Sequence, residues 1–426
     1  MLSGEWPWRS RKGWVDVTGG AIQRYFVGLS RNTFLLACTS LFADISTEML
    51  YPILPVFLTQ TLKASGSVVG LVEGFAQATQ NIVQGFAGTL SDKLQRRKPI
   101  ALVGYFLAAI SKPLMGLATV WQAAFGARLL DRFGAGTRSA PRDALIASSV
   151  SEENRGRAFG LEGVGDNAGA FLGPLLAVFL LYWLHVGIRS VFYLAVIPGL
   201  FAFLLVLLVK ETPVAVASKA KIDVSLRQFP TAYWKYLLVT ALFGLGNSSN
   251  AFLILRTRDI GTSLEMTILI YAAFNLVAAL ISYPAGSLFD NWGGKNVLLA
   301  SFIIFLIGYL GFALTLNVVL IAGFFVFYGL FQGIFRTAGK ALASSFVSDP
   351  LRASGIGWYN TTVGATQLVA SLVAGELWDH VGHAAVFYYG AAFAVVGALA
   401  LWLLIPEMHD RRAYGAVVIK ETKICL

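Results

Sequence analysis

Nine ionisable side chains lie inside the long apolar stretches of this sequence of 426 residues. The acids are Asp44, Glu48, Glu73, Asp131, Glu162 and Asp166, and the bases are Lys112, Arg128 and Arg132. A charge in hydrocarbon costs on the order of several kcal/mol unless it is paired or hydrated. Burial disfavours the ionised form of a carboxyl group, so an acid without a basic partner can exchange a proton near neutral pH. Because six acids face three bases, we expect this group to take part in proton coupling.

Asp44 and Asp166 are the strongest candidates for proton carriers, because both lie near the middle of their apolar stretches. Arg128 or Arg132 would then be the cation that competes with protons for these carboxylates. The alternative is that the charged side chains form static ion pairs that hold the protein together.

The second half of the chain carries neutral hydrogen-bonding and aromatic side chains at comparable positions. They are Asn247, Asn250, Tyr271, Asn275, Tyr328, Gln332, Tyr359, Asn360 and Gln367. We predict a division of labour, in which the charged half handles protons and the neutral half supplies much of the contact with a small-molecule substrate. The alternative is that these side chains only form hydrogen bonds between helices.

Membrane-spanning helices must position these side chains, because 56% of the residues are hydrophobic and only 13% are charged. Such a chain has more apolar surface than a protein in water could bury. A spanning helix needs ~20 largely apolar residues, and the sequence contains twelve such stretches. They cover residues 33–60, 67–90, 99–118, 120–140, 155–184, 188–209, 234–255, 264–289, 296–316, 317–345, 351–379 and 384–405. We therefore predict an all-α polytopic protein of the lipid bilayer; the period-two alternation of membrane β-strands is missing.

The distribution of basic residues predicts the orientation. If the N-terminus is cytoplasmic, 26 of the 33 Lys and Arg residues lie on the cytoplasmic side and four lie on the opposite side. This is the asymmetry of the positive-inside rule, which predicts two cytoplasmic termini in a cytoplasmic (inner) membrane. The net charge of +10 is explained by this orientation, so we expect no nucleic-acid partner.

Two segments of the chain recur at nearly one spacing. The segment that starts at Ala144 resembles the one that starts at Ala341, 197 residues later, and the segment that ends at Asp92 resembles the one that ends at Asp290, 198 residues later. This indicates an internal duplication, and hence two pseudo-symmetric six-helix bundles with a site between them. The predicted domains are a tail (1–32), the first bundle (33–209), a linker (210–233), the second bundle (234–406) and a second tail (407–426).

Motifs of soluble enzymes are missing from the sequence, which has no H-E-x-x-H, no Walker loop and no C-x-x-C pair. Its two cysteines and four histidines are too few and too scattered to indicate a metal centre. We predict a monomer that is not an enzyme and that has no cofactor and no metal site.

The segment from Gly88 to Asp92, with the basic residues that follow it, resembles the best-known signature of the major facilitator superfamily, G-x-L-x-D. The family has a glycine where this chain has Gln95. The segment from Arg128 to Gly136 resembles a second element of the family, R-x-L-q-G-x-G-x-G in the fourth span, with Arg132 in place of a small residue. The resemblance covers essentially the whole chain, and it implies the twelve-helix fold of that family.

The same resemblance implies a cytoplasmic gate. In the family, the aspartate that corresponds to Asp92 holds the two halves together when the cytoplasmic side is closed, with the help of an arginine at the end of span four. The gate would consist of Gly88, Asp92 and Arg96, with Arg138 or Arg142 as that arginine. The alternative is that Asp92 is merely solvated.

A glycine-rich stretch in span five resembles the G-x-x-x-G-P-x-x-G-G motif of the proton-coupled exporters in the family, with Ala177 and Val178 in place of the last two glycines. Gly165, Gly169 and Gly173 recur every four residues, so they form a smooth face that a neighbouring helix can approach closely. Pro174 is a predicted bend, because it leaves a carbonyl without its amide partner. The alternative is ordinary helix packing.

The resemblance therefore implies a transporter that works by alternating access and exports a small organic compound in exchange for protons. Two alternatives stay open. One is a facilitator or importer of a metabolite, metal chelate or ion, and the other is a non-transporting signalling or scaffold protein on the same frame.

Overall fold

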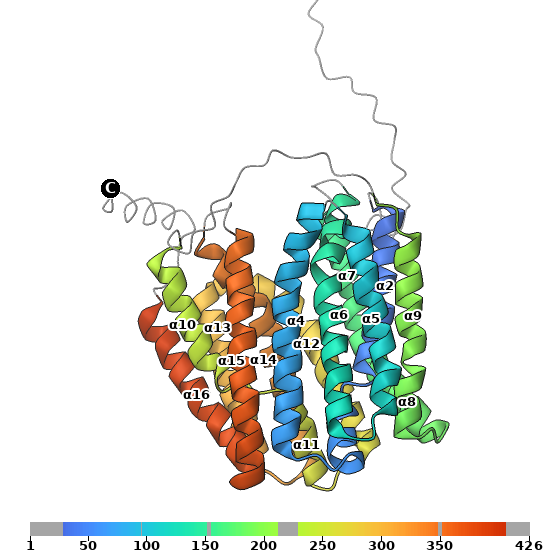
Figure 1. The fold of residues 1–426 in the computed structure, drawn as a ribbon. Helices are drawn as coiled ribbons and strands as arrows, with labels where there is room; N and C mark the ends of the chain where they lie inside the picture. Colours follow the sequence, from blue (N-terminus) through green and yellow to red (C-terminus); the bar gives the residue numbers. More distant parts are fainter. Residues whose placement is uncertain (1–28, 95, 151–154, 212–228, 348–351, 406–426) are drawn as a thin grey trace, which may run out of the picture.

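The computed structural model describes residues 29–94, 96–150, 155–211, 229–347 and 352–405. Within these ranges the chain is helical and has no β-strand. Seven of the described helices are long and apolar enough, by length and composition, to cross a membrane. Figure 1 shows them in one bundle with the other long helices, all running in roughly the same direction or its reverse.

The first half contains six helical passes, each made of one or more elements. They are α2 (Arg31–Glu48) with α3 (Leu54–Val56) and the π-helical turn η1 (Phe57–Thr61), α4 (Gly66–Leu94), α5 (Arg97–Leu117), α6 (Trp121–Ser148), α7 (Arg155–Val178) with η3 (Phe179–Trp183), and α8 (Ile188–Leu194) with α9 (Val196–Leu208). Within this half α2 packs on α7, and α6 packs on both α4 and α5.

The second half repeats this arrangement. Its elements are α10 (Thr231–Gly244) with α11 (Ala251–Asp259), α12 (Leu264–Trp292), α13 (Gly294–Leu314), α14 (Val318–Ser345), α15 (Arg352–His380) and α16 (His383–Leu404). Helix α14 packs on α12 and α13, and the halves meet where α15 contacts α4 and where α12 contacts α7.

The helix bounds reproduce the spacing of the sequence repeat. Both ends of α12 follow those of α4 by 198 residues, and both ends of α13 and of α14 follow those of α5 and of α6 by 197 residues. The spacing found in two short sequence matches therefore extends over whole helices. The prediction of twelve spans in two related bundles is confirmed.

The first and seventh spans are interrupted at corresponding places. Helix α2 ends at Glu48 and α3 begins at Leu54, while α10 ends at Gly244 and α11 begins at Ala251. Pro52 lies in the first break and has no N–H to donate to a helix. Irregular backbone at membrane depth is tolerated where it is buried in protein or lines a cavity, so both breaks point to the boundary between the halves.

Some predicted spans differ from the structure. The first span was predicted as one helix over 33–60, but it is broken after Glu48. The fourth span was predicted to end at residue 140, but α6 continues to Ser148. The seventh span was predicted as one helix over 234–255, but it is broken and extends over α10 and α11.

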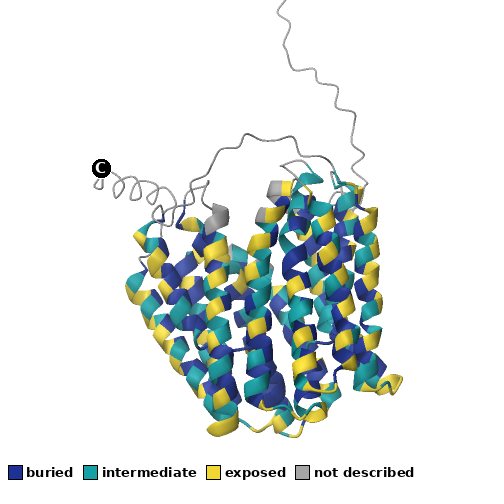
Figure 2. Ribbon diagram, in the orientation of Figure 1, coloured by how far each residue is buried: buried dark blue, intermediate teal, exposed yellow. Residues whose placement is uncertain are grey.

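The outer surface of the bundle is apolar, as a lipid-facing surface requires. Phe86 is 74% exposed, Trp183 71% and Leu314 71%. Figure 2 shows exposed residues along the outward faces of the helices and buried residues on the faces turned to their neighbours. We call the side where α2 begins and α16 ends the terminal side, and the opposite side the distal side.

Candidate functional site

A buried cluster of four charged side chains lies inside the first half, and we call it the α6 cluster: Arg128 and Asp131 on α6, Glu73 on α4 and Lys112 on α5. The Arg128 guanidinium donates through Nε and Nη2 to the two carboxylate oxygens of Glu73, at 3.0 and 3.1 Å. Asp131 accepts from Lys112 Nζ at 2.9 Å and from Arg128 Nη1 at 3.2 Å. All four side chains are buried. Two positive charges thus balance two negative ones in a closed set of short contacts.

A second charged group lies further along α6 towards the terminal side, and we call it the α7 cluster: Asp44 on α2, Arg138 and Arg142 on α6, and Glu162 and Asp166 on α7. Arg142 lies 2.9 Å from Glu162 and 3.6 Å from Asp166. Arg138 lies 3.9 Å from Asp44. The two aspartates are therefore near guanidinium groups, but at distances beyond a hydrogen bond.

Several polar atoms of the α7 cluster are buried and unsatisfied in the described part of the chain. Asp166 Oδ1 has no hydrogen-bond partner there, and neither do Nε and Nη1 of Arg138. The Asp44 side chain is 26% exposed and that of Asp166 is 38% exposed. A buried polar atom without a partner costs free energy, about 1–3 kcal/mol. A change of partners in the α7 cluster could recover this free energy, whereas the charges of the α6 cluster are already paired.

The arginines that face Asp44 and Asp166 are not the ones predicted from the sequence. Arg128 and Arg132 were expected to compete for Asp44 and Asp166, but Arg128 binds Glu73 and Asp131. Arg132 lies 3.5 Å from Asp131 and donates to Gln80 at 3.1 Å. The cations that face Asp44 and Asp166 are Arg138 and Arg142, because α6 continues past the predicted end of the span and carries both into the bundle.

The boundary between the halves is polar at mid-depth. Tyr271 on α12 donates to a carboxylate oxygen of Glu48 on α2 at 3.1 Å. Its ring stacks on Tyr51, which follows α2 in the first break, with ring centroids 5.4 Å apart. Asn275, one turn beyond Tyr271, donates to the carbonyl of Ala170 on α7 at 3.1 Å. Two of the predicted substrate residues thus reach across to the first half.

The other predicted substrate residues lie within the second half. Asn250, at the end of the second break, accepts a hydrogen bond from Tyr328 at 2.7 Å. Tyr359 is buried and stacks on Tyr236, with centroids 5.9 Å apart. The remaining predicted residues are half-buried: Asn247, Gln332, Asn360 and Gln367. The structure therefore brings Asn250 together with Tyr328 and leaves Tyr359 in the core of its own half.

The predicted gate is only partly described. The side chain of Asp92 lies outside the described part of the structure. Arg96 is exposed at the terminal end of the first half. If Gly88 were replaced by a residue with a side chain, the added Cβ would contact only Ala140 of the same half, at 3.2 Å. Arg138 and Arg142 turn to the acids of the α7 cluster. The latch on Asp92 stays a prediction, and both arginines have other acidic partners here.

Contacts between the halves are close on the distal side and sparse on the terminal side. A Cβ on Gly74 of α4 would lie 3.0 Å from the Leu368 side chain of α15. By contrast, a Cβ on Gly357, nearer the terminal end of α15, would meet nothing within 4 Å, and the same holds for Gly286 of α12. Figure 1 shows α4 and α15 closer together at their distal ends than at their terminal ends. The halves therefore separate towards the terminal side.

The three predicted packing glycines of α7 face α2. A Cβ on Gly169 would lie 2.7 Å from Asp44 Cβ and 2.7 Å from the carbonyl oxygen of Leu41, and one on Gly173 would lie 2.8 Å from the amide nitrogen of Met49. A Cβ on Gly165 would collide with the Ala37 carbonyl. The helix continues through Pro174 and ends in the π-helical turn η3. This packing places Asp166 beside α2.

Replacing Gly169 by alanine is expected to lower the free energy of unfolding by about 1–3 kcal/mol, the usual result of overpacking. Gly163 on the same helix is the matched control, because a Cβ there would meet nothing within 4 Å. Thermal unfolding of the two purified variants checks this expectation. Equal melting temperatures for both variants would contradict the packing described above.

One row of candidate polar side chains was missed. Gln77, Gln80, Asn81 and Gln84 follow one another on α4 at the i, i+3, i+4, i+7 spacing of a single helix face. Gln77 donates to Asn81 at 3.4 Å and Gln80 accepts from Arg132, while Asn81 packs on Gly364 of α15. Four amide side chains on one face of a membrane helix are visible in the sequence and could have been identified as candidates. In the structure they lie on α4 between α6 and the second half.

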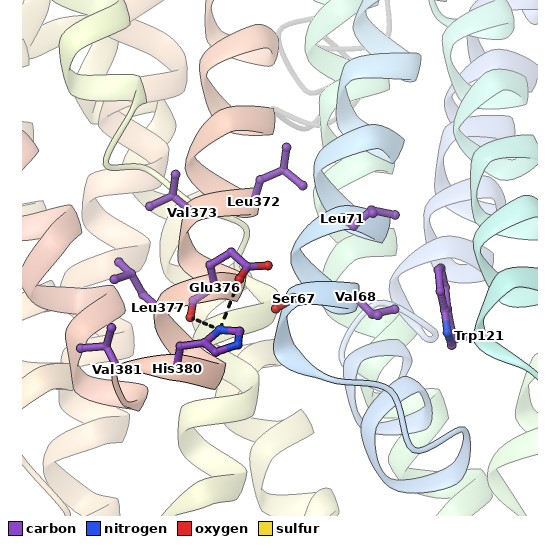
Figure 3. A pocket seen from close by; sticks show the side chains of 10 residues that line it. All are labelled: Ser67, Val68, Leu71, Trp121, Leu372, Val373, Glu376, Leu377, His380 and Val381. Carbon is purple, nitrogen blue, oxygen red and sulfur yellow. Dashed lines mark hydrogen bonds and ion pairs between the residues drawn. The ribbon is translucent and has the colours of Figure 1, made fainter.

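An apolar groove of about 670 Å³ lies elsewhere, near the distal ends of α4 and α15. Figure 3 shows Leu71 and Val68 of α4 between Leu372 of α15 and Trp121 of α6, with Glu376 beside His380. No predicted substrate residue lines this groove. It is separate from the polar boundary at mid-depth.

Two related six-helix halves, with charged groups buried in one and a polar boundary between them, define the architecture of a secondary membrane transporter. The model of the Major Facilitator Superfamily matches residues 36–255 and 236–417. The chain belongs to the Major Facilitator Superfamily, and it is a multi-pass membrane transporter rather than an enzyme.

Relatives and solved structures agree with this assignment. The chain is 34% identical over 379 residues to an uncharacterized MFS-type transporter of Methanocaldococcus jannaschii, covering 88% of this chain and 94% of the relative. It is 29% identical over 272 residues to the multidrug resistance protein MdtG of Klebsiella pneumoniae, covering 60% of this chain and 65% of that protein. The crystal structure of the nucleoside transporter NupG superposes with a TM-score of 0.72 at 16% identity, over 88% of this chain and 99% of that chain. At that identity the likeness shows the fold alone.

Proposed function

We propose that this protein exports a small organic compound in exchange for protons, by alternating access between two conformations. The observation that carries the proposal is the α7 cluster, in which Asp44 and Asp166 lie near Arg138 and Arg142 without forming hydrogen bonds to them. An acid in this position can be held by an arginine or can bind a proton instead. That choice is what proton coupling requires.

The orientation follows from the charges outside the spans. From the sequence, 26 of the 33 Lys and Arg residues were assigned to the side of the N-terminus, and 24 remain once Arg138 and Arg142 are counted inside the bundle. By the positive-inside rule the terminal side would then be cytoplasmic, in a cytoplasmic (inner) membrane. The halves separate towards this side, which corresponds to an inward-facing conformation. Protons would reach the α7 cluster from the cytoplasm in this state and from the opposite side after the halves rearrange.

The coupling step is an exchange of partners around Arg142. Its guanidinium is shared among Glu162 at 2.9 Å, Asp143 at 3.0 Å and the Ser40 hydroxyl at 2.9 Å, with Asp166 further away at 3.6 Å. Loss of a proton from Asp166 would draw Arg142 along α7, away from Glu162 and towards Asp166, and binding of a proton would return it to Glu162. Since Gly169 of α7 packs on α2 beside Asp44, such a change acts directly on the contact between these two helices.

The substrate would bind at the polar boundary at mid-depth, between Glu48, Tyr51 and Tyr271. The stacked tyrosine rings offer an aromatic surface, and the Glu48 carboxylate and the Asn275 amide supply hydrogen-bonding groups from both halves. Relatedness to a protein named for multidrug resistance supports export of an organic compound as the direction of transport.

Transport by the full-length protein in liposomes tests this proposal. A thermal-shift screen of nucleosides, sugars and quinolones first selects a compound that raises the melting temperature, because a ligand of the folded state stabilises it. Uptake of that compound into liposomes that contain none of it is then compared with and without a pH gradient. We expect accumulation against the concentration gradient only when the pH gradient is present. Identical flux in both conditions would rule out proton coupling and leave facilitated transport.

A further inference from the structure

The distal ends of the two halves are joined by one carboxylate. Asp379, in the last turn of α15, accepts hydrogen bonds from the amide of Gly66 at 2.8 Å and from the amide of Ser67 at 2.7 Å. It also accepts from the Ser67 hydroxyl at 2.5 Å. Gly66 and Ser67 are the first two residues of α4, so a side chain of the second half caps a helix of the first.

Helix α4 needs this cap because its own sequence supplies only part of one. The first four amides of a helix have no partner within the helix. Ser65, just before α4, accepts from the amide of Val68 at 3.3 Å, which leaves the first two amides to Asp379. There is no acidic residue in the first turn of α4, and an anion at this end is also favoured by the helix dipole.

The cap requires the two helices to approach very closely, and glycines permit this. A Cβ on Gly375 of α15 would lie 2.6 Å from Ser67 Cα and 2.8 Å from the Gly66 carbonyl oxygen. A Cβ on Gly66 would lie 2.5 Å from the ring of Trp378. Because the hydrogen bonds exist only at this separation, they form when the distal side is closed and break when it opens.

Glu376 provides a contrast on the same helix. It lies one turn before Asp379, its side chain is 66% exposed, and it pairs with His380 of its own helix at 3.2 Å. Figure 3 shows this pair at the edge of the groove, with Ser67 on the facing helix. Glu376 therefore has the same charge and nearly the same depth as Asp379, but its recorded ion pair stays within α15.

We propose that Asp379 is the latch of the distal side, and that its hydrogen bonds to α4 stabilise the closed distal gate. This inference rests on the proposed alternating access, since it concerns the equilibrium between distal-closed and distal-open states. It adds a gating residue that belongs to neither charged cluster. A transporter with a weaker latch would spend more time with its distal side open.

Distance measurements between spin labels test the latch without any substrate. The labels are placed at Thr61→Cys and Val381→Cys, two distal positions in different halves, after Cys38 and Cys425 have been replaced by serine. In full-length protein reconstituted into nanodiscs, Asp379→Ala is expected to raise the ratio of distal-open to distal-closed molecules by about two- to thirtyfold, the range that loss of a helix cap produces. Ser67→Ala, which removes only the hydroxyl contact, should shift the ratio less and in the same direction.

Glu376→Gln is the matched control and should leave the distance distribution of the parent protein unchanged. Unchanged distributions in both Asp379→Ala and Ser67→Ala, or an equal shift in Glu376→Gln, would overturn the latch. Ser67→Ala keeps the test decisive if Asp379→Ala folds poorly. The spin-label measurement and the transport assay are independent tests. The distance distribution can shift whether or not a pH gradient drives transport, so failure of the latch and failure of proton coupling can be told apart.

Discussion

Replacing Asp166 by asparagine is expected to abolish accumulation of substrate against its concentration gradient, while exchange of substrate across the membrane continues. Asparagine keeps the size of the side chain but cannot bind and release a proton near neutral pH. Asp44→Asn should have the same effect, because Asp44 faces Arg138 as Asp166 faces Arg142. Uptake into liposomes without internal substrate, driven by a pH gradient, measures accumulation, and counterflow without a pH gradient measures exchange.

Glu376→Gln is a suitable control for these variants, because it neutralises an exposed acid outside both clusters. It should transport like the parent protein. Uphill transport that is unchanged in both Asp44→Asn and Asp166→Asn would refute their role as proton carriers. Loss of exchange as well as accumulation would indicate a structural defect instead.

Arg128→Met is expected to lower the free energy of unfolding by about 3–5 kcal/mol, the usual effect of leaving a buried charge without its partner. The substitution removes both hydrogen bonds to Glu73 and the contact with Asp131. Thermal or chemical unfolding of the purified variant measures the loss. An effect of this size would mark the α6 cluster as a structural unit.

A double variant separates loss of charge balance from loss of packing. Removing Glu73 together with Arg128, as Glu73→Leu and Arg128→Met, leaves Lys112 paired with Asp131 at 2.9 Å. Replacement of a whole buried ion pair by apolar residues is often neutral or stabilising. The double variant should therefore be more stable than Arg128→Met alone. If it is less stable, the cluster is not held by charge balance.

The architecture could be predicted because duplication and hydrophobicity are both visible in the sequence. The spacing of 197 or 198 residues in two short matches recurs in the bounds of three helix pairs. The breaks in the first and seventh spans were missed, although Pro52 and the glycines Gly244 and Gly246 lie in or beside them. Each apolar run of sufficient length was interpreted as one continuous helix, although proline and glycine residues within such a run can interrupt it.

The ion pairs could be predicted less well, because they depend on where a helix ends and how it is rotated. Arg138 and Arg142 were assigned to a gate since the fourth span was predicted to end at residue 140. In the structure α6 continues, and both side chains lie near the face that carries Arg128 and Asp131, at helical spacing. Extending that row by two turns would have placed both arginines inside the bundle, although the packing of α7 against this part of α6 would still have been unknown.

The distal latch could not be predicted from the sequence. Asp379 and Gly66 are 313 residues apart, and an exposed aspartate near a helix end has no local feature that identifies its partner. Only the packing of the two halves brings them together. The same holds for Tyr271 and Glu48, which are separated by 223 residues.

The central claim is that Asp166 carries the proton that is exchanged for substrate, and infrared spectroscopy detects a protonated carboxyl group directly. A protonated carboxyl group has its own C=O stretching band, so the parent protein and Asp166→Asn in liposomes are compared while the pH falls from about 8 to about 5, above the usual range of an aspartate. The account predicts a carboxyl band that grows in the parent protein and is missing, or clearly reduced, in the variant. A band that grows equally in both proteins, or in neither, would contradict it.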